Sequence, residues 1–160
     1  MGKLCILFSL FLLSCSENNK GSKDVLQNEE ANTAENATLV NPNGIGIQLF
    51  KTLPPQIKQC SGLFVIDTAA AVKQYVFVND LKGKAFLMMD DKLMELKLVK
   101  QTNIDKKTMN ELYVSEDLEV ELKITLDKNL GANAWNYNGV LVVKKEGREE
   151  AINVTGKLGC

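Results

Sequence analysis

The sequence contains no histidine, and Arg148 is its one arginine. Without histidine the chain cannot build Ser-His-Asp or Cys-His nucleophilic sites, and it lacks the commonest general base near neutral pH. A glycine-rich phosphate loop is missing too, because Gly44-Ile45-Gly46 has neither a preceding strand nor the remaining glycine of such a motif. These absences exclude the most common enzyme chemistries.

Carboxylates are the remaining source of acid–base or metal chemistry. The pairs Asp90-Asp91 and Glu116-Asp117 would point to opposite faces if they lay in strands, and acids at turns are ordinarily solvated. Asp127 and Asn129 have the spacing of a calcium loop, but Asn138 stands where its bidentate glutamate belongs. We therefore expect a non-catalytic protein without a metal site or cofactor.

No apolar run is long enough to cross a bilayer as a helix. Leu4–Leu13 is interrupted only by Ser9 and covers roughly 15 Å as a helix, whereas a span needs roughly 20 apolar residues. With Lys3 ahead of it and small residues behind it, the run predicts a secretory signal peptide over residues 1–14. The alternative is a core helix, but the polar residues that follow offer it no packing partner.

The run ends in Leu12-Leu13-Ser14-Cys15, which resembles the lipobox of bacterial lipoproteins. The resemblance implies that Cys15 receives a diacylglyceryl group, becomes the N-terminus after cleavage and carries a further acyl chain such as palmitate. Two or more chains form a stable membrane anchor. Myristoylation of Gly2 is excluded, because Ile6 replaces the required Ser or Thr. The resemblance implies a lipid-anchored protein of the cell envelope. Since Ser16 follows the cysteine, it favours the outer membrane, on its periplasmic or surface face.

Residues 15–43 differ in composition from the rest of the chain. From residue 16 to residue 43, seven of 28 residues are asparagine, none is aromatic, and five acids and two lysines give a formal charge of −3. Such a segment buries too little apolar surface to offset the entropy of ordering it. We expect the lipidated cysteine and a flexible linker here, followed by one small domain over residues 44–160.

The domain shows a period of two, which is the period of β-strands. In LEVELKITL, residues 118–126, apolar residues alternate with glutamate, lysine and threonine. Asp90-Asp91-Lys92 and Glu146-Gly147 mark hairpin turns, and 67–74, DTAAAVKQ, favours a short helix. Further strand-like runs are SGLFVI, QYVFVND, KAFLMM, KLMELKLVK, GVLVVKK and EEAINVTG, with ELYVS weaker. The pattern predicts an all-β fold, a small antiparallel meander barrel of about seven or eight strands, with a sandwich as the alternative.

The four cysteines have three expected fates. Cys5 lies in the signal peptide and Cys15 takes the lipid, which leaves Cys60 and Cys160 in an oxidising compartment. We predict that these two form a disulfide that links the two ends of the domain covalently. An intermolecular bridge and two free thiols are the alternatives. We expect no zinc site, because two cysteines without histidine cannot supply an ordinary four-ligand site.

Candidate partner-binding residues lie in 131–139, GANAWNYNG, which we expect to be a loop. It contains the only tryptophan, Trp135, and Tyr137 among asparagines. Amphipathic aromatics on polar loops are favoured contact residues in recognition. The alternative is that Trp135 plugs one end of the barrel. The charges of residues 44–160 are mixed, 16 bases and 15 acids, and no basic stripe predicts nucleic acid binding.

A lipobox, a small β-domain and cysteines at its first strand and near its end resemble the membrane-bound inhibitors of c-type lysozyme, a family of lipid-anchored barrels. That family's Ser-Gly-x-x-Tyr motif is matched at Ser61 and Gly62, whereas Val65 replaces the tyrosine. Its second motif is scrambled as VTGK at 154–157, so no inhibitory residue is carried over. The sequence is also similar to small Bacteroidetes-type lipoproteins, a likeness that supplies no activity.

These features predict a lipid-anchored envelope lipoprotein that acts as a non-catalytic binding or inhibitory module. Its partner would be a protein or an envelope component, in addition to the membrane that holds the anchor. One alternative is a carrier of a small apolar ligand inside the barrel. The other is a structural or assembly lipoprotein.

We expect cells grown with labelled palmitate to incorporate the label into the wild-type protein, because acylation of Cys15 follows from the lipobox. A Cys15→Ser variant should lose the label, while the matched control Cys5→Ser should keep it. Gel autoradiography and mass analysis of the mature protein measure this. Wild-type protein without label, or mature protein that retains residues 1–14, would contradict the lipoprotein assignment.

Overall fold

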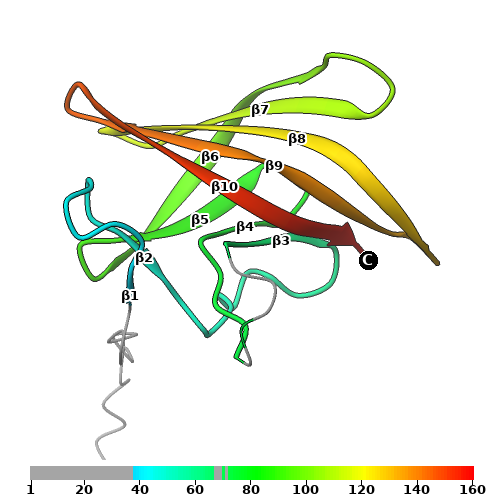
Figure 1. The fold of residues 1–160 in the computed structure, drawn as a ribbon, viewed down its shortest axis with the longest axis horizontal. Helices are drawn as coiled ribbons and strands as arrows, with labels where there is room; N and C mark the ends of the chain where they lie inside the picture. The colour runs from blue at the N-terminus through cyan, green and yellow to red at the C-terminus, as the bar shows by residue number, and fades with distance from the viewer. Residues whose placement is uncertain (1–37, 67–69, 71) are drawn as a thin grey trace, which may run out of the picture. The chain divides into compact units, whose positions relative to one another are not determined.

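The computed structural model describes residues 38–66, 70 and 72–160 (Figure 1). The expected signal peptide, Cys15 and most of the expected linker lie outside the described residues. Within the described part, ten strands form one sheet. They are β1 (Thr38–Leu39), β2 (Ile47–Leu49), β3 (Ser61–Val65), β4 (Phe77–Asn79), β5 (Lys84–Met89), β6 (Lys92–Asn103), β7 (Thr108–Val114), β8 (Leu118–Gly131), β9 (Ala134–Lys145) and β10 (Arg148–Gly159).

Strands β3 to β10 close into an eight-stranded antiparallel barrel. Each strand pairs with the next along the chain, and β10 returns to pair with β3. Strands β1 and β2 lie outside this ring, because β2 pairs with the end of β5 that β4 leaves uncovered. The predicted meander barrel is confirmed. β1 begins ahead of Gly44, where the sequence places the start of the domain.

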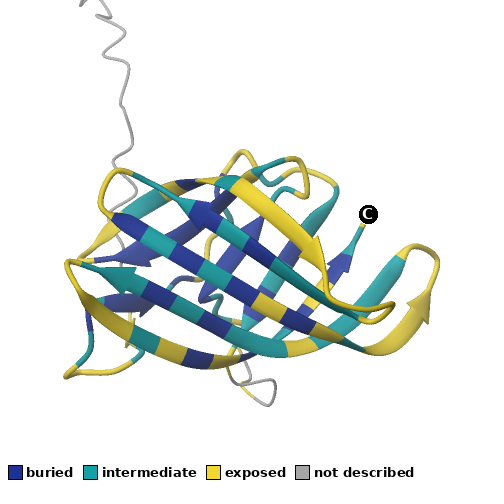
Figure 2. Cartoon of the chain, turned by 90° about the horizontal axis from the view of Figure 1, so that it is seen from above, coloured by how far each residue is buried: buried dark blue, intermediate teal, exposed yellow. Residues whose placement is uncertain are grey.

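Strand β8 shows why this sequence forms a barrel. Leu118, Val120, Leu122 and Ile124 are buried on the inner face, and the residues between them are more exposed. Figure 2 shows the same alternation of buried and more exposed residues along the neighbouring strands. Burying one such side chain contributes roughly 1.5–3 kcal/mol, and a slip of one residue would turn the whole set outward. The period of two therefore selects both the closed sheet and its register.

One end of the barrel is covered by the N-terminal segment. The β5–β6 and β9–β10 turns lie at this end and have positive φ at both central residues, as two-residue hairpins require. Ile45 and Ile47 belong to the inner apolar core, and the Ile45 N–H donates to Glu150 Oε2 over 3.0 Å. The turns predicted at Asp90-Asp91-Lys92 and Glu146-Gly147 are confirmed, but the first is one residue shorter than predicted, because Lys92 already begins β6.

A second apolar cluster covers the outer face of β4 and β5. Val78, Phe86 and Met88 pack there with Phe50 from the connection that precedes β3. Strands buried on both faces read as continuous apolar runs. This double burial explains why KAFLMM lacks the alternation seen in β8.

The short helix expected over 67–74 is not found. Residues 67–69 and 71 lie outside the described residues, and residues 70 and 72–74 have no helical turn. Val72 is 60% exposed, so it does not anchor the segment on the barrel. A helix of one or two turns is too short to persist on alanine propensity without such packing.

Cys60 and Cys160 form a disulfide, with Cα atoms 3.9 Å apart. Cys60 immediately precedes Ser61, which pairs with Gly159, so the disulfide extends the β3–β10 ladder by one step. Strand pairing thus brings together two residues separated by 100 positions. The predicted disulfide is confirmed.

We expect the Cys60→Ser/Cys160→Ser variant to lose about 4 kcal/mol of unfolding free energy, because closing a loop of this length is worth up to about 4.7 kcal/mol in the chain-entropy model. Urea unfolding followed by circular dichroism measures the difference. Wild-type protein under reducing conditions is the control and should match the variant. A loss below about 1 kcal/mol would show that strand pairing alone holds the barrel closed.

Candidate functional site

The candidate site lies at the end of the barrel opposite the N-terminal segment. We call it the disulfide end, and it comprises the Cys60–Cys160 bond and the turns at 80–83, 104–107 and 132–133. In Figure 1 the C-terminus and the tips of the β6–β7 and β8–β9 hairpins lie on this side. β7 last pairs with β8 at Thr108 and Thr125, so β8 continues beyond β7 here and is paired with β9 alone as far as Gly131.

Trp135 and Tyr137 lie on strand β9, so the expectation of a loop over 131–139 is wrong. Only Ala132 and Asn133 form a turn, with φ of 42° and 63°. From Ala134 onward, β9 is paired with β8 on one side and β10 on the other, and this pairing outweighs the turn preference of the asparagines. Both aromatic residues share the inner face of β9 with buried Leu141, and both are half-buried.

Trp135 belongs to a row of inward-facing residues that crosses four strands. It is opposite Leu158 on β10, Leu158 is opposite Gly62 on β3, and Gly62 is opposite Asn79 on β4. Neighbouring strands lie roughly 4.8 Å apart, so the row places an aromatic ring and a buried amide on one continuous inner surface. Pairing through both edges of each strand makes this surface rigid.

Asn79 joins this row to a buried polar network. Its Nδ2 donates to Tyr113 Oη over 3.0 Å and lies 3.4 Å from Glu111 Oε2, while its Oδ1 accepts the Gly62 N–H over 2.9 Å. The Tyr113 hydroxyl donates to Glu111 Oε2 over 2.7 Å. Glu111 is only 4% exposed, and Asn79 is fully buried. A buried network that is hydrogen-bonded in this way specifies one arrangement of the strands that contribute to it.

Burial sets the ionisation of this network. It raises the pKa of Glu111 above the ordinary 4.5, and the hydrogen bond from Tyr113 opposes that shift. Burial also raises the pKa of Tyr113, and the neighbouring Glu111 raises it further. Burial therefore disfavours the charged form of Glu111 relative to a carboxyl group in solvent.

The sequence-based prediction missed these three residues. Glu111 and Tyr113 alternate with more exposed positions in β7, and Asn79 ends the apolar run of β4. Glu111 shares a face of β7 with Tyr113, and a charged residue on an apolar face could have indicated a buried polar network. ELYVS was predicted as a weak strand without assigning its faces.

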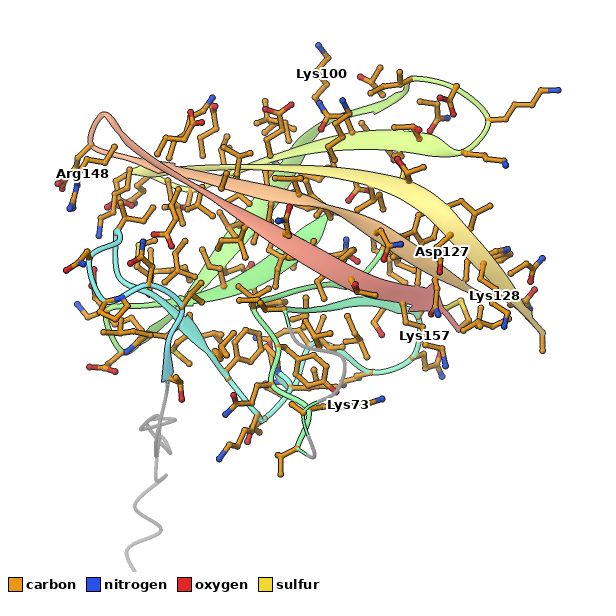
Figure 3. The ribbon with its side chains drawn as sticks, in the orientation of Figure 1. Lys73, Lys100, Asp127, Lys128, Arg148 and Lys157 are labelled. Carbon is orange, nitrogen blue, oxygen red and sulfur yellow. A yellow bond between two sulfur atoms is a disulfide. The ribbon has the colours of Figure 1, made fainter. Side chains whose placement is uncertain are left out.

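A hollow of about 210 Å³ lies on the outer surface of the disulfide end. Its lining includes Ser61 and Leu63 of β3, Ala134 of β9 and Lys157 of β10, beside Cys160. Lys157 is labelled close to the end of β10 in Figure 3. The disulfide end thus presents half-buried aromatics on its inner face and a hollow of mixed polarity on its outer face.

Of the predicted site residues, Trp135, Tyr137, Cys60 and Cys160 come together at this end, and Cys15 lies outside the described residues. In the described ranges, no three acidic or cysteine side chains converge on a metal-sized site. Nor do these ranges contain a helix long and apolar enough to cross a membrane. Comparison with protein-family models, curated proteins and solved structures finds no match to this chain.

We expect the free energy of unfolding of the Glu111→Gln variant, taken relative to that of the wild type, to be higher at pH 8 than at pH 4. A carboxyl whose pKa is raised by folding contributes its stability below the unfolded pKa and loses it as pH rises through the folded pKa. Glutamine keeps the shape and does not ionise. Urea unfolding of both proteins across this pH range measures the difference, and a difference that stays constant with pH would contradict the assignment.

Proposed function

We propose that the protein is a lipid-anchored envelope lipoprotein whose barrel is a non-catalytic binding or inhibitory module. The anchor is Cys15, and the barrel contacts a protein or an envelope component through the disulfide end. The lipobox supports the anchor. The resemblance to bacterial lipoproteins, with Ser16 after the cysteine, favours the outer membrane. The buried Glu111 network has the role of a structural support rather than a catalytic group, because its hydrogen bonds join residues of the barrel to one another.

The observation that carries this proposal is the placement of Trp135 and Tyr137. Both residues are half-buried, so each combines packing within the barrel with partial exposure to solvent. Strands on both sides hold their backbone, and the disulfide ties β3 to the end of the sheet beside them. Rigid aromatic anchors of this kind supply contact area at a low cost in conformational entropy.

Binding at a surface fits the barrel better than carriage of an apolar ligand inside it. The inner face holds a continuous apolar cluster with Phe64, Phe77 and Leu87 fully buried. Phe64 packs so closely on Gly156 that a Cβ there would lie 2.2 Å from the ring. Side chains of this size occupy the interior of a barrel of eight strands.

We expect the immobilised full-length protein to retain a partner from a detergent extract of the source cell envelope, and Trp135→Ala to weaken that retention roughly thirtyfold, the effect of losing a hot-spot residue worth about 2 kcal/mol. Quantitative mass spectrometry of the retained material measures it. Asn136→Ala is the matched control, because Asn136 lies next to Trp135 on the opposite face of β9. No retained partner, or equal losses in the two variants, would contradict the proposal.

A further inference from the structure

Strand β6 extends beyond the start of its neighbour β5 at the disulfide end. β5 begins at Lys84, which pairs with Lys97, and the last hydrogen bond between the two chain segments runs from the Leu98 N–H to Gly83 O over 2.8 Å. β6 continues to Asn103 and is paired there with β7 alone. Residues 99–103 are all exposed. They form a free strand edge, roughly 16 Å long at about 3.3 Å a residue.

The register shows which backbone groups this edge offers. The Ile104 N–H donates to Thr108 O over 2.9 Å, so Ile104 directs its backbone groups toward β7. Residues of an antiparallel strand alternate in this respect, so Thr102 and Lys100 also face β7. The N–H and C=O groups of Gln101 and Asn103 consequently point to the free edge. In the described part of the chain, no strand pairs with them.

Positive charge surrounds the edge. Lys97 and Lys100 lie on the outer face of β6, opposite Val114 and Leu112 of β7, and Figure 3 shows Lys100 projecting away from the barrel. Lys82 lies in the β4–β5 turn and Lys106 and Lys107 in the β6–β7 turn. Among the described residues, none of these five lysines forms an ion pair with a carboxylate.

The acids near this edge have partners already. Glu95 pairs with Lys84, and the Oδ1 atoms of Asp80 and Asp105 accept backbone N–H groups of their own turns. Farther across the outer face, Glu121 accepts from Asn110 and Glu119 pairs with Lys144. Lys84 and Lys144 balance Glu95 and Glu119, whereas Asp80, Asp105 and Glu121 keep their negative charge. The five lysines outnumber these three carboxylates, so an excess of positive charge remains around the edge.

A hollow of about 310 Å³ adjoins the edge on the outer face. Its lining comprises Lys100, Thr102 and Ile104, together with Asn110 and Leu112 of β7 and Glu119 and Glu121 of β8. Ile104 is 54% exposed, which is unusual for so apolar a residue next to unpaired backbone. Glu119 and Glu121 belong to β8, two strands away from the edge, whereas Lys100 lies on β6 itself and is the charge nearest to an added strand.

We propose that residues 99–103 of β6 accept an extended, acidic polypeptide segment as an additional strand. This inference rests on the proposed binding function and names the chemistry of the partner. Backbone hydrogen bonds to Gln101 and Asn103 supply affinity. Acidic side chains facing Lys100 supply selectivity, and Lys97, which lies just beyond the edge opposite Lys84, adds to the positive charge. A second copy of this chain fits the edge poorly, because edge-to-edge pairing would bring two lysine-rich strips together.

The test uses a capped heptapeptide, Thr-Glu-Val-Glu-Val-Glu-Thr, added to the nitrogen-15-labelled full-length protein. Amide hydrogen exchange should slow at least tenfold at Gln101 and Asn103, the two residues whose N–H groups are free. Exchange at Lys100 and Thr102 should change little, since their N–H groups are already bonded to β7. The same peptide with lysine in place of glutamate should give no protection. Absence of protection at Gln101 and Asn103, or equal protection by both peptides, would overturn the proposal.

Two variants separate the backbone contribution from the charge contribution. Gln101→Pro removes one edge N–H without breaking a bond to β7 and should abolish protection of Asn103, while Gln101→Thr, the matched control, should retain it. Lys97→Glu/Lys100→Glu should weaken binding of the acidic peptide at least tenfold and admit the lysine peptide. If Gln101→Pro fails to fold by circular dichroism, the charge-reversal variant decides the outcome alone.

Failure of this inference is distinguishable from failure of the proposed function. If Trp135→Ala loses the envelope partner and the charge-reversal variant keeps it without change, the binding function stands and the edge proposal falls. Dimerisation of the wild-type protein that Gln101→Pro abolishes would also overturn it, because the occupant of the edge would then be a second copy.

Discussion

The pairing of β3 with β10 is the constraint on which the rest of the structure depends. Without it the chain would form an open sheet with two long unpaired edges, and the inner apolar face would remain in water. Phe64 of β3 crosses onto Gly156 of β10, where no side chain stands in its way. The Cys60–Cys160 disulfide follows the last pair of this ladder and holds the two strands together.

The same closure builds the candidate site. It sets the inward-facing residues of β9, β10, β3 and β4 in one row that begins at Trp135 and ends at Asn79. The Asn79 side chain then reaches Glu111 and Tyr113 on β7 across the barrel interior. A surface supported from both edges and from beneath has little freedom to lose on binding. The two surfaces proposed for recognition differ in their strand pairing. Trp135 and Tyr137 lie on β9, which is paired on both sides, whereas residues 99–103 of β6 are paired on one side only.

Alternation and short apolar runs together predicted the barrel and its eight strands, because alternation reports directly which face of a strand is buried and a continuous apolar run indicates burial on both faces. LEVELKITL is the clearest case. The disulfide was predictable from cysteine count and compartment. Local composition was misleading in two places: alanines suggested a helix at 67–74, and asparagines suggested a loop around Trp135, where pairing on both edges of β9 prevailed. The Asn79–Glu111–Tyr113 network and the free edge of β6 depend on register between strands distant in sequence, which no local pattern encodes.

Amide hydrogen exchange of the oxidised and reduced full-length protein tests most directly whether β3–β10 closure supports the site. Reduction should accelerate exchange in β3, in β10 and at Trp135 by far more than in the β7–β8 ladder, because opening would start where the disulfide had joined the ends. Equal acceleration in all strands, or none near Trp135, would show that the site does not depend on this closure.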